Sequence, residues 1–368
     1  MAVSDSSGPN SSGRGVVGLD LSRDVVALTA DLVDIASESR NEQAICDAVS
    51  AALSGFAHLS VERDGNTLVA RTDLGQDQRV VIAGHLDTVP ANDNFPSRLV
   101  GDELWGLGSC DMKGGVAIGL RLAALAAAAR RDVTFVFYEC EEIERVHNGL
   151  GRIARERPEL LAADFAILME PTGGRIEAGC QGTLRAEVVT HGVRAHSARA
   201  WMGENAIHAA GEILTRLNDY QPRRVEVDGL EFREGLNAVG IRGGVAGNVI
   251  PDEAVVIVNF RFAPDQSEDD AADHVRDVFK GFDVTIVDSA PAARPGLTLP
   301  AAAAFVADLG VEVAPKFGWT DVAQFTQLGI PAVNFGPGDP TLAHRADERV
   351  PVDQLRAVEA AMARWLLK

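Results

Sequence analysis

The stretch RVVIAGHLDTVP (residues 79–90) joins a short apolar run to a histidine and an aspartate two positions apart. An apolar run of this length, bounded by polar and turn-forming residues, is typical of a strand buried on both faces of a sheet. Residues i and i+2 of an extended chain face the same side. The stretch therefore predicts a core strand from whose end His85 and Asp87 project together.

Other segments repeat this pattern and alternate with helices. Three further apolar runs bounded by turns lie at 133–138, 164–169 and 331–336. Segments with helical spacing of apolar residues lie at 25–37, 41–54 and 116–129. Strands that alternate with helices favour an α/β layer, in which helices cover both faces of a sheet.

Residues 180–292 follow a different order. They predict strand, helix, two strands, helix and strand, at 183–192, 203–219, 236–246, 253–262, 267–282 and 283–288. A turn, NVIPD (248–252), joins the two middle strands, and Ser267 is placed to cap the second helix. This β-α-β-β-α-β order is that of a ferredoxin-like α+β unit.

The chain of 368 residues is too long for one ordinary core and indicates two domains. We expect an α/β catalytic domain from 19–179 and 293–368, with the α+β unit 180–292 inserted in it. Residues 1–18 are rich in Ser and Gly and predict a flexible tail. They lack the apolar core of a signal peptide, so the expected location is the cytoplasm.

Charge and cysteine content exclude several classes of function. A formal net charge of −19 and a pI near 4.8 disfavour nucleic acid as a partner. No apolar stretch approaches the roughly 20 residues needed to span a bilayer, so no membrane partner is expected. The four cysteines form no CxxC pair, which argues against a disulfide framework and a cysteine-rich zinc site.

Polar residues follow each predicted core strand, where open α/β sheets bind ligands. They are His85, Asp87, Glu141, Glu142, Glu170 and His344, with Asp111 before the glycines that open the Ala-rich helix. A mixed set of imidazoles and carboxylates suits zinc, with cobalt or manganese as substitutes. The number of ligands is that required by two metal ions sharing a carboxylate.

Each of these features also has a structural interpretation. A single histidine at a strand end is often only hydrogen bonded, and an acidic run such as ECEEIE (139–144) is often a solvated turn. DMKGG (111–115) is compatible with a helix start carrying a favourable acid. Several such features at the rim of one sheet favour a metal site. The glycines of 106–115 match a nucleotide-binding fingerprint only loosely.

Five motifs occur along the chain in this order: GHLDTVP, GLGSCDMKGG, ECEE, MEP and GPGDPTLAHRADERV. In these motifs the chain resembles the M20 family of dinuclear zinc amidohydrolases. The resemblance runs from about residue 20 to the C-terminus. GWTDVAQF (318–325) and AVNFGPGD (332–339) make it similar to the succinyl-diaminopimelate desuccinylases of actinobacterial type. It implies a zinc-peptidase-like catalytic domain with an inserted dimerisation and lid domain, and therefore a homodimer.

The resemblance also implies a role for each site residue. Asp111 bridges two zinc ions; one metal site is completed by His85 and Glu170, the other by Glu142 and His344. Glu141 is the general base, and Asp87 lies behind His85 and orients it. His196 reaches the active site of the partner subunit and stabilises the oxyanion. The substrate contacts are Asn248, Arg261 and Thr320.

The implied reaction is hydrolysis of N-succinyl-LL-2,6-diaminopimelate, an amide that carries carboxylates, to succinate and LL-2,6-diaminopimelate. Acetylornithine deacetylase and M20 dipeptidase remain alternatives, as does a non-catalytic binding protein with the same fold. His196 has the alternative role of capping the helix that follows it. Leu107 and Cys140 depart from the family pattern, which commonly has Arg and Asp there, and neither change removes a ligand.

Overall fold

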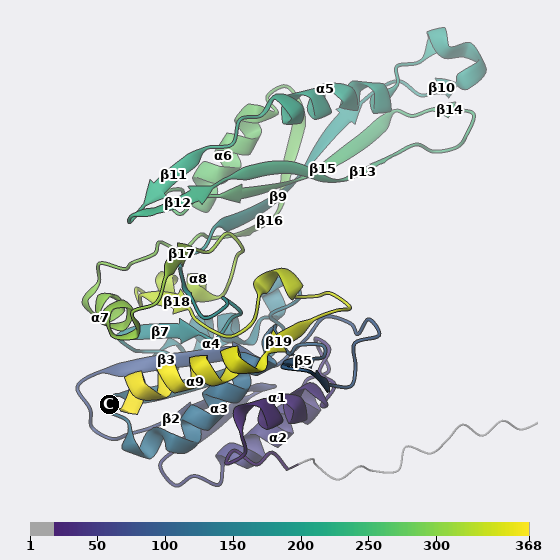
Figure 1. The fold of residues 1–368 in the computed structure, drawn as a ribbon. Coiled ribbons are helices and arrows are strands. Elements are labelled where there is room, and N and C mark those ends of the chain that lie inside the picture. Colours follow the sequence, from purple (N-terminus) through teal and green to yellow (C-terminus); the bar gives the residue numbers. More distant parts are fainter. Residues whose placement is uncertain (1–17, 368) are drawn as a thin grey trace, which may run out of the picture.

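The computed structural model describes residues 18–367 and contains two main sheets (Figure 1). The larger has eight strands in the order β1-β2-β6-β3-β7-β18-β8-β17. Its strands are β1 (Ser60–Asp64), β2 (Thr67–Arg71), β3 (Arg79–His85), β6 (Asp132–Tyr138), β7 (Phe165–Leu168), β8 (Ile176–Ala178), β17 (Val313–Pro315) and β18 (Ala332–Asn334). The predicted tail 1–18, except Gly18, lies outside the described residues.

The centre of this sheet is parallel, and it carries the strands predicted from the sequence. β3 pairs in parallel with both β6 and β7, and β7 pairs in parallel with β18. Ile82 lies opposite Phe135 on one side and Ile167 on the other. The edges are mixed, because β2 runs antiparallel to β6 and β8 antiparallel to β18.

Helices cover both faces of the large sheet, as the α/β prediction requires. One apolar cluster joins Val80 and Ile82 of β3 to the helices α1, α2, α3, α7 and α9, and a second joins Val81 and Ala83 to α4 and α8. The helices are α1 (Val25–Val33), α2 (Gln43–Leu53), α3 (Lys113–Leu125), α4 (Gly149–Glu156), α7 (Pro300–Leu309), α8 (Val322–Gln327) and α9 (Val352–Leu367). Because strand side chains alternate, one strand feeds both clusters.

Short elements connect these layers. A three-stranded sheet contains β4 (Arg98–Val100), β5 (Glu103–Trp105) and β19 (Arg349–Pro351). Single 3-10 turns are η1 (Ala126–Ala128), η2 (Arg145–His147), η3 (Pro158–Leu160) and η5 (Pro340–Leu342). The predicted helix 116–129 is therefore α3 ending at Leu125 and continuing as η1, and the helix predicted over 25–37 ends at Val33.

The second sheet has four antiparallel strands in the order β13-β15-β9-β16. Along the chain its elements are β9 (Gly182–His191), α5 (Ala206–Asp219), β13 (Gly235–Gly243), β15 (Glu253–Phe262), α6 (Glu268–Val278) and β16 (Asp283–Ala290). This confirms the ferredoxin-like order. Ser267 caps α6 through a reciprocal pair of hydrogen bonds with Asp270.

Two additions to this unit were not predicted. A hairpin of β11 (Arg224–Val227) and β12 (Leu230–Arg233) lies between α5 and β13. The turn expected at 248–252 contains β14 (Val249–Ile250), which pairs with β10 (Ala195–His196) beside the 3-10 segment η4 (Ser197–Met202). β10 and β14 form the tip of the unit, at its far end from the large sheet (Figure 1).

The two connections between the sheets run side by side. The backbones of Cys180, two residues before β9, and Ala293, three residues after β16, exchange two hydrogen bonds of 3.0 Å. Trp319 Nε1 donates to Pro291 O at 3.1 Å. Within residues 18–367, no helix is both long and apolar enough to cross a membrane.

Candidate active site

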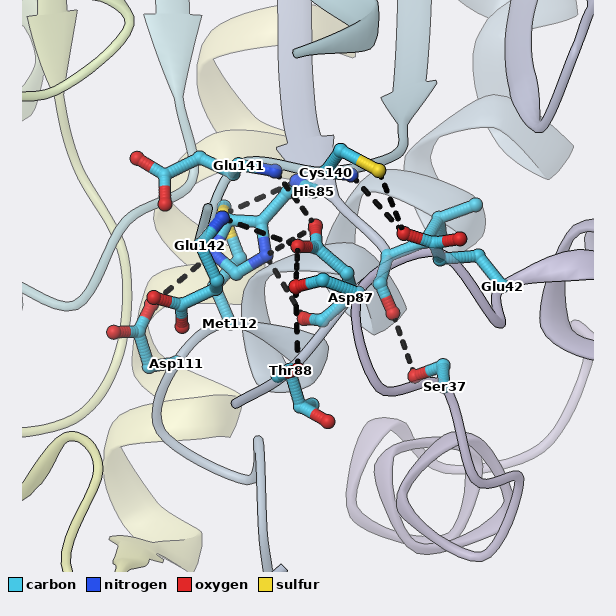
Figure 2. A network of polar contacts seen from close by, with 12 residues as sticks. Ser37, Glu42, His85, Asp87, Thr88, Asp111, Met112, Cys140, Glu141 and Glu142 are labelled. Carbon is cyan, nitrogen blue, oxygen red and sulfur yellow. Dashed lines mark hydrogen bonds and ion pairs between the residues drawn. The ribbon is translucent and has the colours of Figure 1, made fainter. Parts of the chain in front are cut away.

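The metal-ligand candidates gather at the carboxyl ends of the central parallel strands. His85 is the last residue of β3, and Glu141 and Glu142 follow β6 by a few residues. Glu170 follows β7, and His344 lies in the loop after β18. Because parallel strands end at the same edge of a sheet, these residues, which are distant in sequence, meet there. Figure 2 shows His85, Glu141 and Glu142 together with Asp111.

Asp111 lies between the two histidines. Its Oδ1 is 3.2 Å from His85 Nε2, and its Oδ2 is 3.4 Å from His344 Nε2. Glu142 Oε1 lies 2.9 Å from the same nitrogen of His344. One donor atom each from His85, Asp111 and Glu142 fall within 4.8 Å of one another. A carboxylate that turns one oxygen to each of two imidazoles has the arrangement of a bridging ligand.

The electrostatics of this group call for positive charge. Burial, together with the nearby Asp111 carboxylate, raises the pKa of Glu170 to about 8. Burial also raises the pKa of Glu142, while Asp111 and Glu142 raise that of His344 to about 10. Glu170 Oε1 is buried and accepts no hydrogen bond from residues 18–367. Crowded carboxylates and a buried oxygen without a hydrogen bond are stabilised by divalent cations. Imidazole nitrogens and carboxylate oxygens are also the ligand types that zinc binds.

Asp87 holds the loop that carries the two glutamates. Its carboxylate accepts hydrogen bonds from the amides of Glu141 (3.0 Å) and Glu142 (3.1 Å) and from Ser39 Oγ (2.7 Å). The expected contact with the second ring nitrogen of His85 is longer, at 3.5 Å. That nitrogen lies 3.0 Å from the main-chain oxygen of Asp87. The amides of Glu141 and Glu142 compete with His85 for the Asp87 carboxylate. The backbone carbonyl of Asp87 is therefore the nearer acceptor for His85 Nδ1.

Two further carboxylates orient the site and were not singled out from the sequence. Glu348 Oε1 accepts hydrogen bonds from the amides of Cys110 and Asp111, both at 3.0 Å. Glu42 Oε1 accepts from the amide of Cys140 (3.2 Å) and from its thiol (3.3 Å). Glu348 falls within the AHRADERV motif, which was a usable signal. Glu42 is the N-cap residue of α2 and belongs to no motif, so no signal in the sequence marks its role.

The two cysteines near the site are neutral thiols. Burial raises the pKa of Cys140 to about 12, and burial likewise raises that of Cys110 well above its usual range. Cys110 Sγ donates to Asp339 O at 3.2 Å. Cys140 also groups with Glu42 and Glu139, but Glu139 is already paired with Arg152 at 2.8 Å. Carboxylates and histidines therefore remain the better ligands.

A pocket of 480 Å³ opens beside the ligand group. Asp111, Glu141 and His344 form part of its wall, and Thr320 another part. The Thr320 hydroxyl donates to Asn334 Oδ1 at 3.0 Å, so the side chain is already oriented. The volume lies in the range of small-molecule sites.

The structure does not bring the other predicted contacts together within one chain. His196 is exposed at the tip of the inserted unit, where its Nδ1 accepts from the amide of Ala198 at 3.0 Å. The helix-capping role considered for His196 is thus present. Asn248 is beside it, since its main-chain oxygen accepts from the amide of Ser197 at 2.9 Å. Figure 1 places this tip far from the large sheet.

Arg261 lies at the opposite end of the inserted unit. It pairs with Thr183 at the start of β9, close to the connection between the sheets. Phe260 and Phe262 belong to the core under the helices, so Arg261 projects from the uncovered face. Burial lowers the pKa of Arg261, and no carboxylate of residues 18–367 forms an ion pair with it. Arg261 and Asn248 therefore do not form one clamp in a single chain.

Comparison with known proteins gives the same picture. The model of peptidase family M20/M25/M40 matches residues 81–368. A protein of Mycobacterium tuberculosis (strain ATCC 25618 / H37Rv), named putative succinyl-diaminopimelate desuccinylase DapE, is 56% identical over 354 residues, covering 95% of this chain and 99% of its own. The succinyl-diaminopimelate desuccinylase of Corynebacterium glutamicum is 46% identical over 360 residues, covering 95% and 98%.

Solved structures share the fold. A tripeptidase of Staphylococcus aureus has a TM-score of 0.76 at 20% identity and covers 95% of this chain and 98% of its own. A dinuclear metal-binding peptidase of the M20 family from Bacillus subtilis has a TM-score of 0.68 at 19% identity, covering 92% and 95%. At these identities the likeness concerns the fold. The family match, the two similar relatives and the ligand group agree: the chain belongs to peptidase family M20/M25/M40.

Proposed function

We propose that this enzyme hydrolyses N-succinyl-LL-2,6-diaminopimelate to succinate and LL-2,6-diaminopimelate, a step of lysine and diaminopimelate biosynthesis. The observation that carries the proposal is the Asp111 carboxylate between two histidines with Glu141 beside it. The relatives from Mycobacterium and Corynebacterium support the choice of substrate. A biosynthetic role of this kind also supports a cytoplasmic location.

The proposed metal site holds two zinc ions, for which cobalt can substitute. His85 and Glu170 would hold one ion and Glu142 and His344 the other, with Asp111 shared. Bound zinc supplies Lewis acidity and lowers the pKa of water. The remaining work falls to side chains of the protein.

Glu141 is the proposed general base. Its backbone amide is fixed by Asp87, while its carboxylate accepts no hydrogen bond from residues 18–367 and is free to take a proton. Burial raises the pKa of Glu141 well above its usual range, and the Glu170 carboxylate adds to the shift. A raised pKa makes a carboxylate a stronger base toward the proton of water. Glu141 would then pass the proton to the leaving amine.

We propose a homodimer built on the inserted unit. β13 is an edge strand, and it exposes Val239 and Ile241 at 60% and 56%. The tip exposes Trp201 at 81% and Met202 at 61%. Apolar side chains along an edge strand and a projecting tip favour burial against a second copy.

A dimer also explains the position of the tip. His196 and Asn248 are too far from the metal ligands to act within one chain, but a tip that crosses to the partner can complete the partner's site. His196 would then stabilise the oxyanion and Asn248 contact the substrate, together with Arg261 and Thr320 of the chain that holds the metals. Residues 180–292 would serve as a dimerisation and lid domain on the catalytic residues 19–179 and 293–368.

The test is a substrate panel assayed after chelation, with and without added zinc. We expect zinc-dependent turnover of N-succinyl-LL-2,6-diaminopimelate at a kcat/KM far above that of N-acetylornithine or of dipeptides. A preference for N-acetylornithine would indicate an acetylornithine deacetylase, and a preference for a dipeptide would indicate an M20 dipeptidase. Absence of turnover on every member of the panel would favour a binding protein with this fold.

A further inference from the structure

The pocket contains a cation that the metal site does not use. Its lining includes the carboxylates of Asp111, Glu141, Glu142, Glu170 and Glu177. The cationic side chains among its lining residues are His344, which faces Asp111 and Glu142, and Lys316. Lys316 is 8% exposed, so the structure buries an ammonium group at the wall of an acidic pocket.

The ammonium of Lys316 has a donor to spare. Its Nζ lies 2.8 Å from Glu177 Oε2 and 3.5 Å from Pro171 O. An ammonium carries three donors. One of them reaches Pro171 O, and the ion pair with Glu177 occupies at most one more, so at least one donor stays free. Burial opposes the charge of Lys316, but the carboxylates of Glu177 and Glu170 outweigh burial and raise its pKa. Lys316 is therefore a charged donor.

Lys316 lies on the pocket wall that adjoins the metal-ligand candidates. Pro171, whose carbonyl it approaches, directly follows the metal-ligand candidate Glu170. In an extended succinyl chain, the terminal carboxylate carbon lies roughly 4 Å from the scissile carbonyl carbon. A carbonyl held at the metal ligands thus brings its carboxylate to the neighbouring wall. Thr320, four residues further along the same loop, lines that wall too.

We infer that Lys316 binds the terminal carboxylate of the acyl group and is a specificity-determining residue. This inference rests on the proposed function. Glu177 holds the ammonium in place, and burial strengthens its attraction for a carboxylate. An acyl group without that carboxylate would leave the buried donor without an acceptor, which disfavours acetyl and other uncharged acyl groups.

The test compares N-succinyl-LL-2,6-diaminopimelate with its N-butyryl analogue, in which a methyl group replaces the terminal carboxylate. The enzymes are wild type, Lys316→Met, Lys316→Arg and the control Arg175→Met, all loaded with zinc. Arg175 pairs with the other oxygen of Glu177 at 3.6 Å but does not line the pocket. Lys316→Gln, which can still donate to Glu177, is the second neutral variant if Lys316→Met fails to fold.

We expect Lys316→Met to lower kcat/KM for the succinyl substrate roughly 10- to 100-fold, the range for one charge-assisted hydrogen bond. The loss should appear mainly in KM, because the contact exists before and during the reaction. Turnover of the butyryl analogue, zinc content and the behaviour of Arg175→Met should stay near wild type. Lys316→Arg should keep most of the preference for succinyl.

An equal loss on both substrates would overturn the inference and leave Lys316 a structural residue. Unchanged succinyl selectivity in the neutral variants would overturn it as well. If the wild-type enzyme itself showed no preference for succinyl over butyryl, the proposed function would fail, and the role of Lys316 with it.

Discussion

The loop that carries Glu141, the proposed general base, is anchored by Glu42, and removing the Glu42 side chain should reduce catalysis strongly. Glu42 is completely buried, and its Oε1 accepts from the amides of Arg40 (2.9 Å) and Cys140 (3.2 Å). Cys140 has a φ of 58°, in the left-handed region. With Asp87 holding the next two amides, two carboxylates fix three successive residues of this loop.

The magnitude follows from these contacts. Glu42→Ala leaves the buried amide of Cys140 without its acceptor, which costs about 1–3 kcal/mol of stability. Cys140 also loses an anchor for its left-handed conformation, so Glu141 and Glu142 shift. A displacement of about 1 Å at catalytic groups costs on the order of 100-fold in rate. We expect kcat to fall by about that factor.

The assay measures kcat, KM, zinc content and thermal unfolding for Glu42→Ala and Glu42→Gln. Gln keeps an oxygen acceptor for the Cys140 amide, so this control should lose less than about tenfold in kcat. Ser39→Ala is a second control, because Asp87 keeps both amides without the Ser39 hydroxyl. A folded Glu42→Ala enzyme with wild-type kcat would refute the reasoning.

Other residues give further tests. Glu141→Ala should keep its zinc, measured by atomic absorption, and lose nearly all turnover; wild-type activity would exclude it as the base. Mixing inactive His196→Ala with inactive Glu141→Ala should restore part of the activity in mixed dimers, and none if the site lies within one chain. Burial opposes the charge of Asp132, but hydrogen bonds from the amides of Leu74 and Gln76 and from Thr72 lower its pKa below 3.8. Asp132→Asn should lower the free energy of unfolding in urea by about 1–2 kcal/mol at pH 7. This loss should shrink as the pH falls below 3.8 through the folded-state pKa of Asp132. A loss of stability that does not change with pH would contradict this.

The central strands could be predicted because strands buried on both faces consist of continuous apolar runs. Val80 to Ala83 are all apolar, and each faces one of the two helical layers. The polar residues that end these strands could be predicted for the same reason, since the parallel order brings strand ends together. Hence the sequence alone predicted that His85, Glu141, Glu142 and Glu170 lie at one edge of the sheet.

Contacts between loops could not be predicted. Glu42 and Lys316 act through bonds to residues 98 and 139 positions away, Cys140 and Glu177, and neither has a local pattern that marks it. The segment that contains β14 was expected to be a turn, and β10 was not predicted, because two-residue strands are too short to show alternation. The nearer acceptor for His85 Nδ1 depended on a competition for Asp87 that only the three-dimensional structure reveals.

The central claim is that Asp111 is shared by two cations, and anomalous scattering at the zinc edge tests it most directly. Crystals of the zinc-loaded enzyme should show two peaks per chain, one between His85 and Asp111 Oδ1 and one between His344 and Asp111 Oδ2. A single peak, or two peaks that leave Asp111 outside the coordination of either ion, would contradict the account.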